Sequence, residues 1–412
     1  MSGHCRCRKG SGVAVMKLIE RRGYLEKLKS AIGTPDIKVI TGVRRSGKSK
    51  LLEALAAYVR DQVPDSCVIH VNFNLLEFEA LQEYHALYRY INDRCEPGKA
   101  NFVFIDEVQL CQGFEKAVNS LHASEKFDIF LTGSNAFLLS SDLATLFTGR
   151  TFEIQVFPFS FAEFNQYYGT TDLQKALDRY IVQGGLAGSY VYQEREARYD
   201  YIADVFDTLI LRDIKQKYRV RYPVTLENIS EFLMDNVGNL ASGRSIAKAL
   251  LAGQDKAAPN TVRNYLQYLC NAFAFYKVRR YDIRGKKYLA ASEKYYLSDP
   301  AFRYAKLGTK NLDTGRILEN IVALELLRRG YEIYAGVLYK TEIDFVALKR
   351  DEKLYIQVAG DISAEETLQR EVRPLLAIRD AYPKILLART RQGPGSYEGI
   401  QILDLAEWLA QS

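Results

Sequence analysis

The residues most clearly suited to chemistry form the stretch GVRRSGKS at positions 42–49, directly after the apolar run 37–41. Their spacing is G-x-x-x-x-G-K-[ST], the pattern of a phosphate-binding loop. Its glycines allow backbone conformations that point N–H groups at phosphate oxygens, and Lys48 adds a cation for the β- and γ-phosphates. Ser49 offers a hydroxyl to Mg²⁺ where the helix pattern 51–63 begins. We predict a site for ATP and Mg²⁺ lined by Gly42, Val43, Arg44, Arg45, Ser46, Gly47, Lys48 and Ser49.

Two adjacent acids, Asp106 and Glu107, follow the apolar run 101–105. Carboxylates at the end of a buried strand are costly unless their charge is used. We expect Asp106 to hold Mg²⁺, directly or through water, and Glu107 to act as the general base for the attacking water. The plainer alternative is that both acids only cap the end of a strand.

A third apolar run, 127–131, ends in the small polar residues Thr-Gly-Ser-Asn at 132–135. In ATPases with a phosphate loop and a catalytic glutamate, a polar side chain on the adjacent strand contacts the γ-phosphate or its water. Asn135 and Ser134 are the two candidates for this role. Ordinary turn chemistry at a strand end explains the same residues equally well.

The elements that must position these residues alternate between strand and helix from residue 37 to residue 156. This order predicts an α/β fold with a parallel sheet. With these motifs the chain resembles the AAA+ ATPases, and more closely a group of prokaryotic AAA-type ATPases that carry a C-terminal domain of unknown function. The resemblance rests on GVRRSGKS (42–49), FIDEVQ (104–109), LTGSNA (131–136), TGR (148–150), VFPFSFAEF (156–164), GG (184–185) and LRDI (211–214).

The resemblance implies that an arginine completes the stabilisation of the transferring phosphate. Arg150 stands where the family places such an arginine, and Arg212 is a second candidate. A solvated or ion-paired side chain is the plainer interpretation of either. The resemblance also implies an ATPase core at 16–156, followed by a helical lid over the nucleotide at 157–217.

A basic segment follows the expected lid. Helix patterns at 226–234, 242–251 and 261–276 precede two short strands folded at Gly285, which predicts a winged-helix module over 218–300. Residues 241–290 hold ten basic and two acidic residues. This charge favours contact with a nucleic acid, DNA above all, while a protein-docking wing is the rival interpretation. The candidate contact residues are Arg244, Lys248, Arg263, Lys277, Arg279, Arg280, Arg284, Lys286 and Lys287.

The C-terminal segment 301–412 resembles the PD-(D/E)xK nuclease superfamily in its order of helices and strands. The resemblance implies a second metal site formed by Glu319, Asp344 and Gln357, with Gln357 in place of the third acid. Ala359 occupies the superfamily's lysine position, so the attacking water and the leaving charge lack a cation. We therefore expect a small nuclease-like α/β domain that has lost catalysis and binds nucleic acid or a partner. The plainer alternative keeps Glu319 and Asp344 as a hydrogen-bonded structural pair.

Composition limits the remaining possibilities. The 412 residues carry 56 Lys and Arg against 50 Asp and Glu, and 48% are hydrophobic, which excludes wholesale disorder. The six cysteines form no C-x-x-C pair and no run of about 18 apolar residues occurs, so we expect a cytoplasmic protein with reduced thiols and no membrane segment. Residues 1–15 are predicted to be a disordered tail or an upstream extension.

Together these motifs predict an ATPase that couples its nucleotide state to the binding of nucleic acid or a protein partner. They leave open whether the protein forms oligomers. Two other classes stay open: a nucleotide-switched signalling module with little turnover, and an ATP-dependent nuclease of the defence or mobile-element type.

Overall fold

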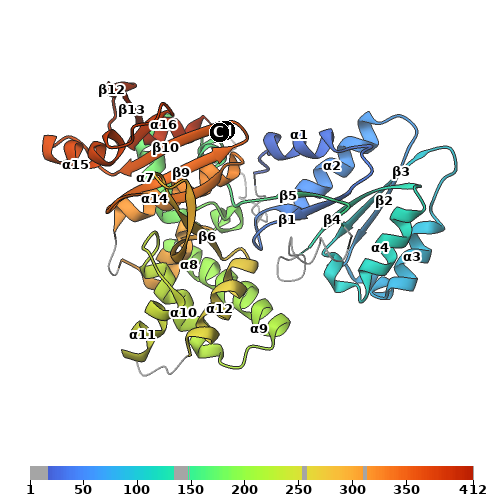
Figure 1. Cartoon of the computed structure of the whole chain (residues 1–412). Coiled ribbons are helices and arrows are strands. Elements are labelled where there is room, and N and C mark those ends of the chain that lie inside the picture. Colours follow the sequence, from blue (N-terminus) through green and yellow to red (C-terminus); the bar gives the residue numbers. More distant parts are fainter. Residues whose placement is uncertain (1–16, 134–146, 148, 253–257, 310–312, 412) are drawn as a thin grey trace, which may run out of the picture.

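The computed structural model describes residues 17–133, 147, 149–252, 258–309 and 313–411. An N-terminal α/β unit lies on one side of the molecule, and the chain from α6 (Phe161–Tyr168) onward forms a second body (Figure 1). Within the described residues, none of the helices combines the length and the apolar character needed to cross a membrane.

A five-stranded parallel sheet forms the centre of the N-terminal unit. The strands lie in the order β2-β3-β4-β1-β5, and every neighbouring pair is parallel. Both faces of the sheet are covered, so all the residues of β1 are buried. The prediction of an α/β fold with a parallel sheet is therefore confirmed. The strands are β1 (Ile37–Thr41), β2 (Ser66–Asn72), β3 (Ala100–Asp106), β4 (Phe127–Thr132) and β5 (Thr151–Gln155).

Helices cover both faces of this sheet because side chains along a strand alternate between them. Ile40 of β1 packs with α1 and α2, whereas Ile37 and Val39 pack with α3 and α4. The covering elements are α1 (Arg22–Ser30), α2 (Lys48–Gln62), α3 (Tyr84–Asn92) and α4 (Phe114–Ala123), with the short helices η1 (Leu76–Leu81) and η2 (Val108–Leu110). Because the strands are parallel, the loops that follow β1, β3 and β4 meet at one edge of the sheet.

A helical region connects the two sheets along the chain. Its second half has an apolar core in which Phe206, Leu226, Leu233 and Phe302 pack together. Helices therefore occupy the segments expected as a lid and as the helical part of a winged helix. After α6 come α7 (Leu173–Gln183), η3 (Ala187–Val191), α8 (Arg195–Asp204), the π-helical η4 (Val205–Leu211), α9 (Arg212–Tyr218), α10 (Pro223–Asp235), α11 (Gly243–Ala252), α12 (Pro259–Asn271) and α13 (Pro300–Leu307).

The expected wing is part of a larger sheet. An eight-stranded sheet runs in the order β12-β13-β11-β10-β9-β8-β6-β7, so the hairpin β6–β7 forms its edge. Strand β6 pairs in parallel with β8, and the N–H of Ile283 donates to the carbonyl of Val337 at 3.0 Å. One continuous sheet therefore spans the boundary that we expected between residues 300 and 301. Its strands are β6 (Phe275–Asp282), β7 (Lys287–Leu297), β8 (Glu332–Leu338), β9 (Thr341–Lys349), β10 (Glu352–Ala359), β11 (Lys384–Ala388), β12 (Gly395–Tyr397) and β13 (Ile400–Asp404).

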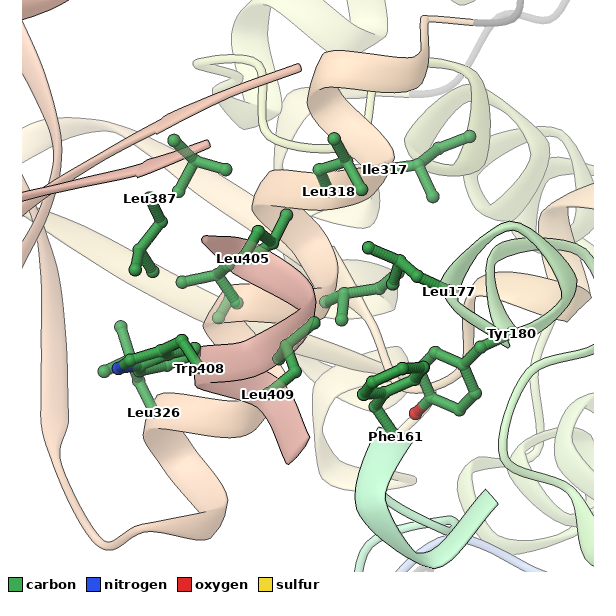
Figure 2. Close-up of a cluster of buried hydrophobic side chains, with 14 of the residues drawn as sticks. Phe161, Leu177, Tyr180, Ile317, Leu318, Leu326, Leu387, Leu405, Trp408 and Leu409 are labelled. Atoms are coloured by element: carbon green, nitrogen blue, oxygen red, sulfur yellow. The ribbon is translucent and has the colours of Figure 1, made fainter. Parts of the chain in front are cut away.

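A second apolar core joins the expected lid helices to the C-terminal sheet (Figure 2). Phe161 of α6 and Leu177 and Tyr180 of α7 lie beside side chains of α14 (Thr314–Arg328) and α16 (Leu405–Ala410). These partners include Ile317, Leu318, Leu326, Leu405, Trp408 and Leu409, together with Leu387 of β11. The remaining helix, α15 (Glu365–Leu376), packs on β10. We call the eight-stranded sheet with α14, α15 and α16 the C-terminal body. A displacement of α6 or α7 would therefore be passed to the C-terminal body through close packing.

Candidate functional site

The loop that carries the G-x-x-x-x-G-K-S pattern joins the end of β1 to the start of α2. Gly42 has a φ of 139°, and a Cβ atom placed there would lie 2.0 Å from the carbonyl oxygen of Val156. Gly47 has a φ of 95° directly before α2 begins at Lys48. Residues with a Cβ atom rarely adopt these conformations, so the backbone requires glycine at both positions.

The ammonium group of Lys48 is buried and folds back onto the loop. Its Nζ atom donates to the carbonyl oxygens of Gly42 at 2.9 Å and of Val43 at 3.2 Å. Burial lowers the pKa of Lys48 to about 8, and the carboxylates of Glu107 and Asp106 offset this effect only in part. The carboxylates therefore compensate the ammonium group of Lys48 only in part, and a bound phosphate group would add the negative charge that favours it.

Asp106 lies at the end of β3 and is almost fully buried. The hydroxyl of Ser49 donates to its Oδ1 atom at 3.1 Å, and the hydroxyl of Thr132 donates to the same oxygen. Burial raises the pKa of Asp106, and the two hydroxyls oppose that shift. A carboxylate and a serine hydroxyl that already touch are the oxygen ligands that suit Mg²⁺, so these residues fit that ion.

Glu107 adopts an unusual backbone conformation beside this carboxylate. Its φ of 54° lies in the left-handed region, which costs a non-glycine residue about 1–2 kcal/mol. Two contacts hold it there: its N–H donates to the hydroxyl of Thr132 at 3.1 Å, and the amide of Gln109 donates to its Oε2 atom. The strained residue is the one expected to act as general base.

Thr132 links both acids, although the motifs did not single it out. It is the last residue of β4, and its hydroxyl donates to Asp106 and accepts from the N–H of Glu107. The signal in the sequence was one hydroxyl residue directly after an apolar strand. Asn135 and Ser134, the residues that we predicted for this strand end, lie outside the described residues.

An ion pair joins the expected lid to the loop, beside the apolar packing of Val43 in the core of the lid. Arg44 Nε donates to Asp213 Oδ2 of α9 at 2.6 Å. Burial raises the pKa of Asp213, and Arg44 opposes that shift. Arg212, the second arginine candidate, is exposed beside Asp213 at the start of α9. The segment LRDI therefore places the carboxylate of Asp213 next to the loop.

Arg150 lies far along the sheet from this site. Its carbonyl oxygen accepts from the N–H of Ile37 at 2.9 Å, at the first residue of β1. Gly42 follows the last residue of that strand, so Arg150 and the loop lie at opposite ends of β1. The structure does not bring Arg150 together with Lys48 of the same chain.

Glu319, Asp344 and Gln357 do lie together in the C-terminal body. The N–H of Asp344 donates to Gln357 Oε1 at 3.3 Å. The Oδ2 atom of Asp344 accepts from the N–H of Val358 at 2.9 Å. Burial and the charge of Glu319 raise the pKa of Asp344 well above its usual value.

A lysine that no motif indicated pairs with two acids of this second cluster. Lys294 of β7 places its Nζ atom 2.7 Å from Glu319 and 2.6 Å from Glu342, and its side chain is only 2% exposed. Tyr296 also donates to Glu319, at 2.6 Å. Among the described residues, no cluster of three or more His, Cys, Asp or Glu side chains has the geometry of a metal site. The ammonium group of Lys294 therefore lies beside Glu319, where the prediction placed a divalent cation.

The basic candidates are spread over two surfaces. Arg244, Lys248 and Arg263 are exposed on α11 and α12, and the others lie on the hairpin β6–β7. The guanidinium of Arg279 lies 5.0 Å from the ring centre of exposed Tyr288. The remaining hairpin candidates are Lys277, Arg280, Arg284, Lys286 and Lys287, all of them exposed except the half-buried Arg280.

The sheet and the loop together define the class of protein. A parallel sheet whose first strand leads through G-x-x-x-x-G-K-S into a helix, with acids at the end of β3 and with β4 between the two strands, is a P-loop nucleoside triphosphatase core. Residues 34–165 match the family described as an AAA domain. Residues 174–313 match a domain of unknown function (DUF8612), whose description assigns no activity.

Whole-chain relatives extend this match. An uncharacterized protein of Haemophilus influenzae is 38% identical over 400 residues, which cover 96% of this chain and 99% of that protein. Uncharacterized protein MJ1544 of Methanocaldococcus jannaschii is 28% identical over 356 residues, or 82% of this chain and 77% of that protein. The solved structure of the Walker-type ATPase PABY2304 of Pyrococcus abyssi shares 17% identity and a TM-score of 0.49, covering 70% of this chain and 95% of that one. The chain belongs to the family of the Haemophilus influenzae protein, and it carries an AAA domain with a P-loop.

Proposed function

We propose that the protein is a Mg²⁺-dependent ATPase that couples its nucleotide state to the binding of nucleic acid. The observation that carries this proposal is the convergence of Lys48, Ser49, Asp106 and Glu107 at one edge of the parallel sheet. The nearby carboxylates compensate the charge of Lys48 only in part, and the side chains of Ser49 and Asp106 already touch. Such a site favours an anion together with a divalent cation.

Each residue then has one task in hydrolysis. Lys48 and the loop N–H groups bind the phosphates, and Ser49 and Asp106 provide oxygen ligands for Mg²⁺, which would withdraw charge from the phosphates. Glu107 accepts the proton of the attacking water. The contact between Gln109 and Glu107 Oε2 orients this carboxylate before any ligand is present.

Two features support coupling between nucleotide and partner. Asp213 of the expected lid pairs with Arg44 of the loop, so phosphates that attract Arg44 compete with this contact. The expected lid helices share a core with the C-terminal sheet (Figure 2). The basic hairpin β6–β7 forms one edge of that sheet. Exposed cations beside exposed Tyr288 suit a polyanion with aromatic bases.

Steady-state hydrolysis tests the enzymatic part of the proposal. We expect ATP turnover by the full chain in Mg²⁺ and a loss of roughly 100- to 10,000-fold in Glu107→Gln, because water then lacks its base. ATP should still bind to this variant with an affinity within a few-fold of the parent. Glu77→Gln, a change at an exposed glutamate of η1, is the matched control. Full turnover by Glu107→Gln would overturn the assignment, and binding without turnover by the parent would favour the nucleotide-switched module.

Binding of labelled DNA at several salt concentrations tests the partner class. If phosphates are the target, log K should fall with log salt by about 0.9 for each phosphate contact. Replacing Arg284, Lys286 and Lys287 by Gln should flatten that slope. DNA affinity in the parent that stays nearly constant with salt would favour a protein partner instead. DNA-stimulated turnover, measured in the same series, would support coupling.

A further inference from the structure

Arg21, which precedes α1, is in contact with three parts of the fold although no motif includes it. Only 7% of its surface is exposed. Its Nη1 atom donates to the carbonyl oxygen of Ser46 in the phosphate loop at 2.9 Å. Its Nε and Nη2 atoms donate to the two carboxylate oxygens of Glu163 in α6 at 2.8 and 2.9 Å. The guanidinium also lies over the ring of Tyr24, 4.4 Å from its centre.

The contact with Ser46 fixes the direction of a phosphate-binding group. In a trans peptide, the C=O of one residue and the N–H of the next point to opposite sides. Because Arg21 holds the carbonyl of Ser46, the N–H of Gly47 points away from Arg21. In a phosphate-binding loop, N–H groups of this kind face the anion. If the peptide turned over, its carbonyl oxygen would face the anion instead and repel it.

The contact with Glu163 anchors Arg21 to the expected lid. Glu163 and Ser160 form a capping box at the start of α6, in which the N–H of Ser160 donates to Glu163 Oε2 at 2.8 Å. Burial alone would raise the pKa of Glu163, but Arg21 and then Arg328 outweigh burial, so its pKa is lowered and it stays ionised. A two-point contact between Arg21 and a fixed carboxylate restrains the guanidinium strongly.

The C-terminal body reaches the same place. Arg328 of α14 donates to the carbonyl oxygen of Pro158 at 3.4 Å, just before α6. The Nη2 atom of Arg21 lies 3.5 Å from that same oxygen. The phosphate loop, the start of α6 and α14 therefore meet around two arginines.

We propose that Arg21 is a positioning residue that holds the Ser46–Gly47 peptide in the orientation that binds phosphate. It thereby ties phosphate occupancy to helix α6 and the C-terminal body. This inference rests on the proposed function, because it presumes that the loop binds a nucleoside triphosphate.

Calorimetry on the full chain tests the inference, with two ligands: ATP in Mg²⁺ and tripolyphosphate, which lacks a base. Arg21→Gln should weaken both ligands roughly 10- to 100-fold, the range expected when one hydrogen bond from a charged donor is lost. The two losses should be equal, because the affected group faces phosphate. Arg22→Gln is the matched control, since Arg22 is 84% exposed and pairs with Glu20 at the surface. It should bind both ligands as the parent does.

A purely structural role for Arg21 gives a different result. In that case Arg21→Gln would lower the unfolding temperature while the folded protein bound both ligands as tightly as the parent, and this outcome would overturn the proposal. If Arg21→Gln does not fold, Arg21→Lys replaces it. One ammonium group cannot serve both Glu163 oxygens and the Ser46 carbonyl, so a several-fold loss of phosphate affinity is still expected. Absence of ATP binding by the parent would instead refute the proposed function.

Discussion

Lys48 and Lys294, two of the buried lysines among the described residues, both face carboxylates, and they differ in how far those carboxylates compensate their charge. Burial alone would lower the pKa of both. At Lys48 burial dominates and the pKa falls to about 8. At Lys294 the carboxylates of Glu319, Asp344 and Glu342 outweigh burial, and its pKa is raised. The nearby carboxylates therefore compensate the burial of Lys48 only in part, whereas those around Lys294 more than compensate its burial.

The partners of the acids explain this difference. Asp106 is hydrogen-bonded to the neutral hydroxyls of Ser49 and Thr132, so its charge stays available to a cation. Glu319 is bound by an ammonium group that β7 supplies. A group of acids therefore indicates a cation site only when no lysine or arginine has already neutralised it.

The strongest test of this comparison removes the internal cation. Lys294→Met leaves Glu319, Glu342 and Asp344 without a counter-charge, and we expect a loss of about 3–5 kcal/mol in unfolding free energy. The measurement is denaturant unfolding of the full chain. Lys248→Met, a change at an exposed residue of α11, should cost little.

A second substitution and a metal ion sharpen that result. Adding Glu319→Gln to Lys294→Met should restore part of the lost stability, because it removes one of the uncompensated charges. Mn²⁺ should raise the unfolding temperature of Lys294→Met more than that of the parent, since the carboxylates are then open to a cation. Two results would contradict the interpretation that Lys294 keeps a metal ion out of the second acid cluster. One is equal stabilisation of both proteins by Mn²⁺, and the other is DNA cleavage by the parent that Asp344→Ala abolishes.

The sequence predicted the first site better than the second, and the reason is the distance between contacts along the chain. The loop 42–49 is contiguous, and a parallel sheet brings Asp106 and Glu107 to it, so motif and topology were sufficient. Lys294 meets Glu319 because α14 packs against β7, whose hairpin partner β6 pairs in parallel with β8 of the C-terminal sheet. We had assigned that hairpin to a separate module. No local pattern reports such a pairing, and the same holds for the contact of Arg21 with Ser46.

A smaller effect is expected from the hydroxyl that joins the two acids of the first site. Thr132→Val keeps the shape of the side chain but removes the donor to Asp106 and the acceptor for the Glu107 N–H. We expect kcat to fall about 10- to 100-fold, which corresponds to roughly 1.5–3 kcal/mol. Because the hydroxyl lowers the pKa of Asp106, its loss should also move the acidic limb of the rate profile to higher pH. Thr341→Val, at an exposed residue of β9, is the control. An unchanged rate profile would show that Asp106 does not need this donor.

The smallest expected effect is a change of ADP affinity with pH, and it distinguishes Lys48 from Lys294 by their pKa values. The pKa of Lys48 is about 8, so its ammonium is present below that pH and is lost above it. Between pH 7 and pH 9 the charged fraction of the free protein falls about tenfold, and ADP affinity should fall by up to the same factor. The pKa of Lys294 is raised above its ordinary 10.5, so its contribution to folding stays complete over this range and is lost only at higher pH. Lys48→Arg, which keeps its charge, should flatten the pH dependence of ADP affinity even if it binds less tightly. An ADP affinity in the parent that stays constant to pH 9 would mean that Lys48 is compensated as fully as Lys294, and the contrast between the two sites would disappear.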